Sequence, residues 1–125
     1  MIAGEGMTGD VDRDELRHRL GEPGLFLLDV RSAAEFAGTL GAPCDPRQGR
    51  IEGAQHLDVQ ELMTLTAEQI QERLPEGAEV VAYCHSGSRS AVAVQILRAA
   101  GVEARNYPGS WHEWSRDDSL PFETG

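Results

Sequence analysis

The sequence predicts an α/β fold, a single domain in which a parallel sheet of about five strands is covered by helices on both faces. Two apolar runs of strand length, at residues 25–30 and 79–83, indicate strands that are buried on both sides. Segments with the three- and four-residue spacing of helices alternate with these runs, which is typical of parallel sheets with helical crossovers. The length of 125 residues and the hydrophobic content of 40% fit one domain.

The N-terminal part predicts a flexible segment followed by a helix. Residues 1–9 carry three glycines and no periodic pattern, so we expect them to be a flexible lead-in to a domain over residues 10–125. Asp12 and Glu15 have the spacing of a capping box, which marks the start of the first helix. The first apolar run then follows as a central parallel strand.

The part between the two apolar runs is less regular. Ser32 is placed to cap a short helix, and residues 38–49 form a loop of about a dozen residues, a length that is usually functional or mobile in a compact domain. Thr66 and Gln69 repeat the capping-box pattern. The remaining predicted elements are a strand at 54–57, a helical turn at 59–63, a helix at 66–74, a strand at 79–83, a helix at 90–100, a strand at 102–107 and a short capped helix at 110–114 before a polar tail.

The composition narrows the classes of partner and the location. A formal net charge of -10 argues against nucleic acid or an anionic membrane as a partner, because both attract basic surfaces. The sequence has neither an apolar run long enough to span a bilayer nor the pattern of a signal peptide, so a cytoplasmic location is expected. Cys44 and Cys84 are interpreted as free thiols, as expected in a reducing compartment.

The strongest chemical signal is the segment from Cys84 to Ser90, between the second apolar run and a predicted helix. A strand, a polar turn containing Gly87 and a helix start are the parts of a backbone anion cradle. The N–H groups of such a cradle would stabilise a thiolate and lower the pKa of Cys84 from the free value of roughly 8.5. Cys84 is therefore the candidate nucleophile, and the alternative is a buried, inert thiol at the end of a core strand.

The spacing within this turn distinguishes between two chemistries. Cysteine phosphatases have five residues between the nucleophile and the arginine that clamps phosphate, whereas four residues separate Cys84 from Arg89. A cradle that is one residue shorter fits a tetrahedral phosphate poorly and can enclose a sulfur atom carried on the cysteine. The spacing favours sulfur over phosphate.

Four stretches together resemble the rhodanese-type sulfurtransferases. They are Leu-Asp-Val-Arg at 28–31 with Glu-Phe at 35–36, Gly-Arg-Ile-Glu-Gly-Ala at 49–54, the loop from Cys84 to Arg89, and the segment 107–114 followed by Leu-Pro at 120–121. The last of these is similar to the end of the catalytic C-terminal half of the two-domain thiosulfate and 3-mercaptopyruvate sulfurtransferases. The resemblance spans roughly residues 10–122.

This resemblance implies a ping-pong transfer of a sulfane sulfur. Cys84 would take sulfur from a small donor, thiosulfate or 3-mercaptopyruvate, and pass it from a persulfide to a thiophilic acceptor such as cyanide or a thiol. Main-chain N–H groups across the active-site loop His85, Ser86, Gly87, Ser88, Arg89 and Ser90 would hold the persulfide, and no metal or organic cofactor is implied. The alternatives are a weakly active sulfur-carrier or protein-interaction module and a phosphatase or arsenate reductase of the related loop type.

Several positions depart from the two-domain enzymes. His85 and Ser86 replace two basic residues that follow the cysteine in thiosulfate-preferring enzymes, and Glu35 stands where those enzymes tend to have a donor-binding arginine. Arg47 or Arg31 is a candidate for the missing cation. The family's second domain has no counterpart in the chain, so a homo-oligomer or a partner protein is expected to cover the corresponding interface.

Other polar residues receive an expected role from their positions. Asp29 and Arg31, flanking a strand end, are interpreted as structural, and His85 as a donor-contacting or tuning residue. Cys44 is interpreted as incidental, with a resolving thiol as the alternative. Ser88 or Ser90 is expected to cap the following helix, and Trp111 to be either a core residue or part of the substrate wall. The spacing of His18, His56 and His112 predicts no metal site with the cysteines.

Overall fold

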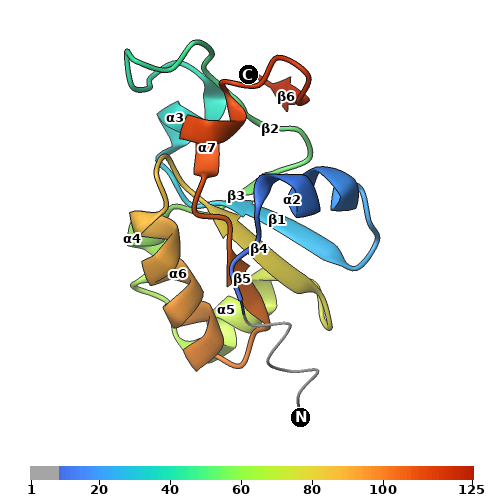
Figure 1. Ribbon diagram of the computed structural model, residues 1–125. Helices are drawn as coiled ribbons and strands as arrows, with labels where there is room; N and C mark the ends of the chain where they lie inside the picture. Colours follow the sequence, from blue (N-terminus) through green and yellow to red (C-terminus); the bar gives the residue numbers. More distant parts are fainter. Residues whose placement is uncertain (1–8) are drawn as a thin grey trace.

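The computed structural model describes residues 9–125, which form an α/β unit (Figure 1). The predicted lead-in lies outside the described residues except for Gly9, whose carbonyl accepts a hydrogen bond from Arg105. The helices are α2 (Arg13–Arg19), α3 (Ala33–Ala37), α4 (Val59–Leu62), α5 (Ala67–Arg73), α6 (Ser88–Ala99) and α7 (Ser110–Trp114). The strands are β1 (Leu25–Asp29), β2 (Arg50–Ile51), β3 (Gln55–His56), β4 (Glu79–Tyr83), β5 (Ala104–Asn106) and β6 (Phe122–Glu123).

The main sheet is parallel and has four strands in the order β3-β1-β4-β5, one fewer than predicted. The two apolar runs form its centre, where β1 and β4 pair along their whole length from Leu25 opposite Glu79 to Asp29 opposite Tyr83. All four strands run in the same direction, so their carboxyl ends lie at one edge. In a parallel sheet, this edge is where binding sites are built.

Two further strands, β2 and β6, form a small antiparallel sheet that the sequence pattern does not predict. Each has two residues, and β6 lies in what was predicted to be a polar tail. Arg50 pairs with Glu123 and Ile51 with Phe122, so the tail folds back onto the segment that precedes β3. Two residues are too few to show the alternation of apolar and polar side chains that marks a strand in a sequence. Such short strands are defined by their pairing with each other.

Helices cover both faces of the main sheet, as predicted (Figure 1). Alternate strand residues point to opposite faces. Leu28, Val80 and Ala82 pack in one cluster with residues of α4, α5 and α6. Val81 and Tyr83 belong to the cluster on the other face, which includes residues of α2 and α7. Because both faces of β1 and β4 are covered, successive residues of these strands are apolar in place of alternating with polar ones.

The predicted helix starts are confirmed for α2, α3 and α5. Asp12 accepts from the Glu15 N–H, and Ser32 and Thr66 form complete capping boxes with Glu35 and Gln69. The predicted serine cap of the long helix is wrong, since α6 begins two residues earlier, after Gly87, and has no side-chain cap. α7 likewise has no side-chain cap. Among the helices from residue 9 onward, none combines the length and the apolar character that crossing a membrane requires.

Candidate active site

Cys84 lies just beyond the carboxyl end of the central strand β4, between the sheet and the start of α6. Its side chain is buried. Its backbone N–H donates to the Ser110 hydroxyl at 3.1 Å, and its carbonyl accepts from the Trp111 N–H at 3.0 Å. Ser110 has a positive φ of 58°, which is unusual for a residue other than glycine, and its hydroxyl also donates to the Tyr107 carbonyl at 2.9 Å. The first turn of α7 therefore fixes the position of Cys84.

The loop after Cys84 directs its donors at the sulfur. The Gly87 N–H lies 3.1 Å from Sγ, and the N–H and hydroxyl of Ser90 each lie 3.4 Å from it. Gly87 has a φ of 98°, and a Cβ at this position would lie 2.8 Å from the Pro108 carbonyl oxygen. Only glycine meets both conditions, so the cradle depends on it.

These donors offset the cost of burying the thiolate. Burial by itself raises the pKa of the Cys84 thiol, but hydrogen bonds from the Ser90 hydroxyl and from the N–H groups of Ser90, Gly87 and Ser86 outweigh it. The resulting pKa is below that of an ordinary cysteine. A thiolate is the nucleophilic form of cysteine, so these hydrogen bonds favour the nucleophilic form of Cys84.

Arg89 lies at the rim of the cradle, with its charge paired to Glu35 of α3. Two guanidinium nitrogens donate to the two carboxylate oxygens at 2.9 and 3.2 Å. Burial raises the pKa of Glu35, but the hydrogen bonds from Arg89 and from the Ser32 backbone have a larger, opposite effect. The resulting pKa is about 2, below the ordinary value of 4.5. Glu35 therefore stays ionised, and the cationic rim expected from Arg89 is largely neutralised.

His85 belongs to a second group of polar side chains that residue spacing does not predict. Its Nε2 lies 2.9 Å from an oxygen of Asp45, a buried residue in the long loop 38–49. The other oxygen of Asp45 accepts from Arg116 at 2.8 Å and lies 3.6 Å from Nδ1 of His112. The length of the loop was the one sequence signal of a functional position, since the contacts of Asp45 with Arg116 and His112 span about seventy residues.

Cys44 joins the same group, contrary to what residue spacing alone indicated. One ligand atom from each of Cys44, Asp45, His85 and His112 can be chosen so that all four lie within 4.8 Å of one another. The sequence predicted no metal site involving His112, because the four residues come from three separate segments. Their proximity is a property of the tertiary structure.

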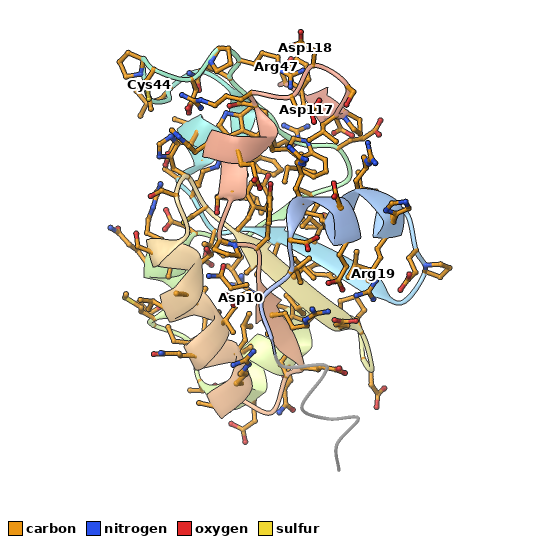
Figure 2. All side chains as sticks on the ribbon, in the orientation of Figure 1. Asp10, Arg19, Cys44, Arg47, Asp117 and Asp118 are labelled. Atoms are coloured by element: carbon orange, nitrogen blue, oxygen red, sulfur yellow. The ribbon has the colours of Figure 1, made fainter. Side chains whose placement is uncertain are left out.

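The two candidate substrate contacts outside the loop have other partners. Arg47 donates to the carbonyls of Trp114, Ser115 and Asp117 and lies over the Phe122 ring, so its charge caps the end of α7. Figure 2 shows Arg47 close to Asp117. Trp111 is fully buried, and its indole N–H donates to the Arg47 carbonyl at 3.0 Å. Both residues join loop 38–49 to α7.

Arg31 and Asp29 form a buried pair. The Arg31 guanidinium makes three hydrogen bonds to the Asp29 carboxylate and a fourth, from Nη2, to the Gly49 carbonyl at 2.6 Å. Neither side chain is more than 1% exposed. This geometry agrees with the structural role predicted for the pair. Because the Arg31 guanidinium is buried and paired, it cannot contact a sulfur donor from solvent. His56 also supports this region through its bond to the Arg31 carbonyl.

The remaining loop serines differ from one another. Ser86 and Ser88 are exposed, whereas Ser90 is buried and contacts the sulfur of Cys84. The hydroxyl of Ser90 is therefore part of the cradle and not a helix cap.

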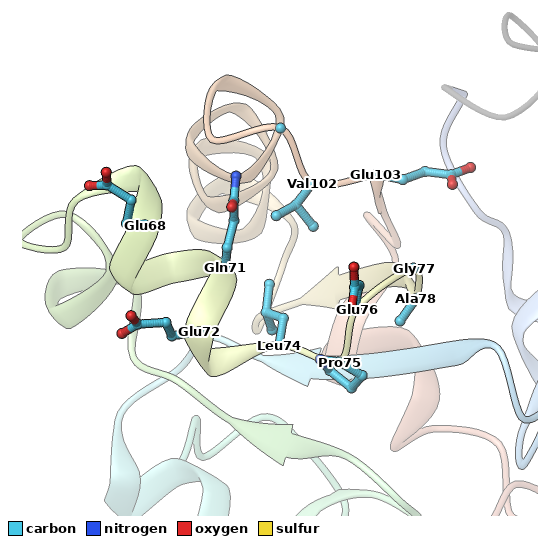
Figure 3. A pocket seen from close by; sticks show the side chains of 11 residues that line it. Glu68, Gln71, Glu72, Leu74, Pro75, Glu76, Gly77, Ala78, Val102 and Glu103 are labelled. Carbon is cyan, nitrogen blue, oxygen red and sulfur yellow. The ribbon is translucent and has the colours of Figure 1, made fainter.

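A pocket at the opposite edge of the sheet is separate from this site (Figure 3). It includes residues that immediately precede β4 and β5, at their amino ends, and its polar lining is mostly glutamate. The lining residues are Glu68, Gln71, Glu72, Leu74, Pro75, Glu76, Gly77, Ala78, Gly101, Val102 and Glu103.

Comparison with known proteins gives a consistent result. A family model described as the rhodanese-like domain matches residues 12–117. A probable 3-mercaptopyruvate sulfurtransferase of Pseudomonas aeruginosa is 38% identical over 92% of this chain and 44% of its own length. A thiosulfate sulfurtransferase of Corynebacterium glutamicum is 31% identical over 82% of this chain and 39% of its own length.

A solved structure resembles the chain in fold and sequence. The crystal structure of a probable thiosulfate sulfurtransferase superposes with a TM-score of 0.77 and 46% identity, covering 91% of this chain and 47% of that one. The chain thus spans less than half the length of each of these three proteins.

Proposed function

The chain belongs to the rhodanese-like domain family, and from this premise we propose that it is a sulfurtransferase in which Cys84 carries the transferred sulfur as a persulfide. The single observation that carries the proposal is the set of donors around the sulfur: two backbone N–H groups and one hydroxyl, at 3.1 to 3.4 Å. Such an arrangement stabilises a sulfur anion in a site with little water. Relatives named as sulfurtransferases support the same chemistry.

In the first half-reaction the Cys84 thiolate attacks the outer sulfur of the donor. The new S–S bond forms as the bond between the donor's sulfur and its remainder breaks, and the electron pair leaves with sulfite from thiosulfate or with pyruvate from 3-mercaptopyruvate. The 3-mercaptopyruvate thiol proton moves to the departing carbon. The product on the enzyme is a Cys84 persulfide anion, held by the N–H groups of the cradle.

In the second half-reaction a nucleophilic acceptor takes the outer sulfur and returns Cys84 to the thiolate. Cyanide becomes thiocyanate, and a thiolate becomes a persulfide. Both steps balance in atoms and charge without an oxidant, so the proposed reaction requires no metal or organic cofactor. We propose a cytoplasmic location for the reaction, where thiols are kept reduced.

The electrostatics of the rim bear on the choice of donor. Arg89 is paired with Glu35, and Arg47 and Arg31 are both occupied in the interior contacts described above. The mouth of the cradle therefore offers little free positive charge to a doubly charged anion. On this basis 3-mercaptopyruvate, with one negative charge, is the favoured donor over thiosulfate.

Intact-mass spectrometry after incubation with each donor tests the proposal. The wild-type chain is expected to gain the mass of one sulfur and to lose it on addition of cyanide. Cys84→Ser should show no gain, and Cys44→Ser, the matched control, should behave as the wild type. No gain with either donor would favour a non-catalytic interaction module, and turnover of an aryl phosphate would favour phosphatase chemistry.

A further inference from the structure

Beyond sulfur transfer, we propose that Cys44, Asp45, His85 and His112 bind a single zinc ion at the mouth of the active site. Thiolate, carboxylate and imidazole are the three side-chain groups that zinc uses in proteins. The four residues supply one potential ligand atom each, and these atoms lie within 4.8 Å of one another. Within the described residues 9–125, this is the one such group that combines cysteine and histidine.

The side chains of Cys44, His85 and His112 all approach the carboxylate of Asp45, which would supply one of its two oxygens to the ion. Nε2 of His85 lies 2.9 Å from one Asp45 oxygen, and Nδ1 of His112 lies 3.6 Å from the other. Sγ of Cys44 lies 3.9 Å from the latter oxygen. Ligand atoms around a tetrahedral zinc ion with ordinary bond lengths lie about 3.3–3.8 Å apart. Small side-chain movements would bring the four atoms to these separations.

The surroundings of the cluster hold its ligands in place. Arg116 donates to one oxygen of Asp45 at 2.8 Å, to the Cys44 carbonyl at 2.8 Å and to the His112 carbonyl at 2.6 Å. One cation therefore fixes the segments that carry three of the four ligands. Zinc ligands are commonly oriented by such outer hydrogen bonds. With Cys44 ionised, two anionic ligands offset the charge of the ion while Arg116 remains bound.

The site is open to the ion from one side. The Cys44 side chain is exposed and that of His112 is half exposed, whereas the Asp45 side chain is buried. Figure 2 shows Cys44 on the outer part of loop 38–49. An ion can thus enter from solvent and meet the buried carboxylate beneath.

Zinc bound here would affect the neighbouring nucleophile. His85 directly follows Cys84, and its carbonyl accepts from the His112 N–H at 2.9 Å. Through its four ligands, zinc would connect His85 in the active-site loop with His112 of α7 and with Cys44 and Asp45 of loop 38–49. We therefore expect the ion to stabilise the fold and to inhibit sulfur transfer by holding His85, the residue next to Cys84, against loop 38–49. The inhibition rests on the proposed function, but the binding itself does not.

Calorimetric titration with zinc chloride in a weakly binding buffer tests the site directly. The expected result is one ion per chain with release of the Cys44 proton, and a raised unfolding temperature. Cys44→Ser and His112→Ala should each weaken binding at least tenfold. His18→Ala, at a histidine on α2 whose Nδ1 contacts only its own helix, is the matched control and should leave the affinity unchanged.

Two further variants and a second metal make the test decisive. Cobalt(II) in place of zinc should give a thiolate-to-metal absorption band that is absent in Cys44→Ser and present in Cys84→Ser. Equal zinc affinity in the wild type and in correctly folded Cys44→Ser and His112→Ala would overturn the proposal. So would binding that disappears in Cys84→Ser alone, because the catalytic thiol would then be the ligand.

An activity measurement separates this proposal from the preceding one. If the chain transfers sulfur, zinc should inhibit the wild type and a chelator should restore its rate, while Cys44→Ser should resist inhibition at the same zinc concentration. A chain that binds zinc as described and shows no sulfur transfer would support the metal site and contradict the proposed function.

Discussion

The sulfur of Cys84 accepts hydrogen bonds from groups whose positions depend on single residues. Gly87 allows the turn because its φ is positive and Pro108 lies against it, and Ser90 contributes both its N–H and its hydroxyl. The backbone donors remain in place as long as Gly87 keeps the turn. The hydroxyl of Ser90, which lies 3.4 Å from the sulfur and 3.2 Å from the Gly87 carbonyl, is the contribution to this cradle that comes from a side chain.

Ser90→Ala is expected to raise the pKa of Cys84, because a donor to the thiolate is lost while burial remains. Less thiolate would then be present at a given pH, so the acid side of the kcat/KM profile should move to higher pH. A shift of about one unit corresponds to about tenfold slower turnover on that side. The pH dependence of thiol alkylation measures the same pKa without relying on the enzymatic reaction.

Ser119→Ala is the control, since Ser119 is exposed and bonds to Asp117. An alkylation profile of Ser90→Ala that coincides with that of the wild type would show that the backbone N–H groups alone set the pKa of the thiol.

At the scale of elements, ion pairs connect segments that are far apart in sequence around the carboxyl edge of the sheet. Arg31 and Asp29 link the end of β1 to Gly49 in the buried interior. Glu35 and Arg89 link α3 to the first turn of α6, at a partly exposed position. If one member of the buried pair is removed, the other charge stays buried without a partner, which is strongly destabilising. The second pair is partly screened by solvent, so its loss costs less stability.

Glu35→Gln tests the second pair, because the amide keeps an oxygen for the cap of α3 but loses the charge that faces Arg89. The folded-state pKa of about 2 lies below the ordinary value of 4.5, so the pair stabilises the fold above pH 4.5. This contribution is lost as the pH falls through about 2. The difference from the wild type should be on the order of 1 kcal/mol at pH 7 and should shrink as the pH falls below 4.5.

Denaturant unfolding at a series of pH values measures this difference. Glu61→Gln removes an exposed pair with Arg73 and serves as the control with little expected effect. A stability difference between Glu35→Gln and the wild type that stays constant from pH 7 to pH 3 would contradict the assigned pKa of Glu35.

At the scale of the whole molecule, the C-terminal segment closes the fold beside the active edge. β6 pairs with β2, the Pro121 carbonyl accepts from the indole N–H of Trp114, and the Phe122 ring lies near that of Trp111. Figure 1 shows the end of the chain next to β2. Residues 121–125 thus cover the helix that positions Cys84.

Removal of residues 121–125 is expected to loosen this helix. Trp114 would lose its hydrogen-bond acceptor and Trp111 an aromatic neighbour, so tryptophan emission should shift to the red. The unfolding free energy should fall by about 2 kcal/mol. Thr124→Ala, which keeps β6, is the control. Unchanged emission and an unchanged unfolding midpoint in the truncated chain would show that β6 does not support α7.

The sequence by itself determined the α/β fold, the two central strands, the capped starts of α2, α3 and α5, and the loop that places Cys84 beyond a strand end. These features depend on local patterns: apolar runs, caps and the spacing from Cys84 to Arg89. Only the tertiary structure decided that β2 and β6 pair, that Glu35 neutralises Arg89, and that Cys44 and His112 meet Asp45 and His85. Each of these contacts joins segments distant in the chain, and no local pattern encodes which distant side chain completes a hydrogen bond or an ion pair.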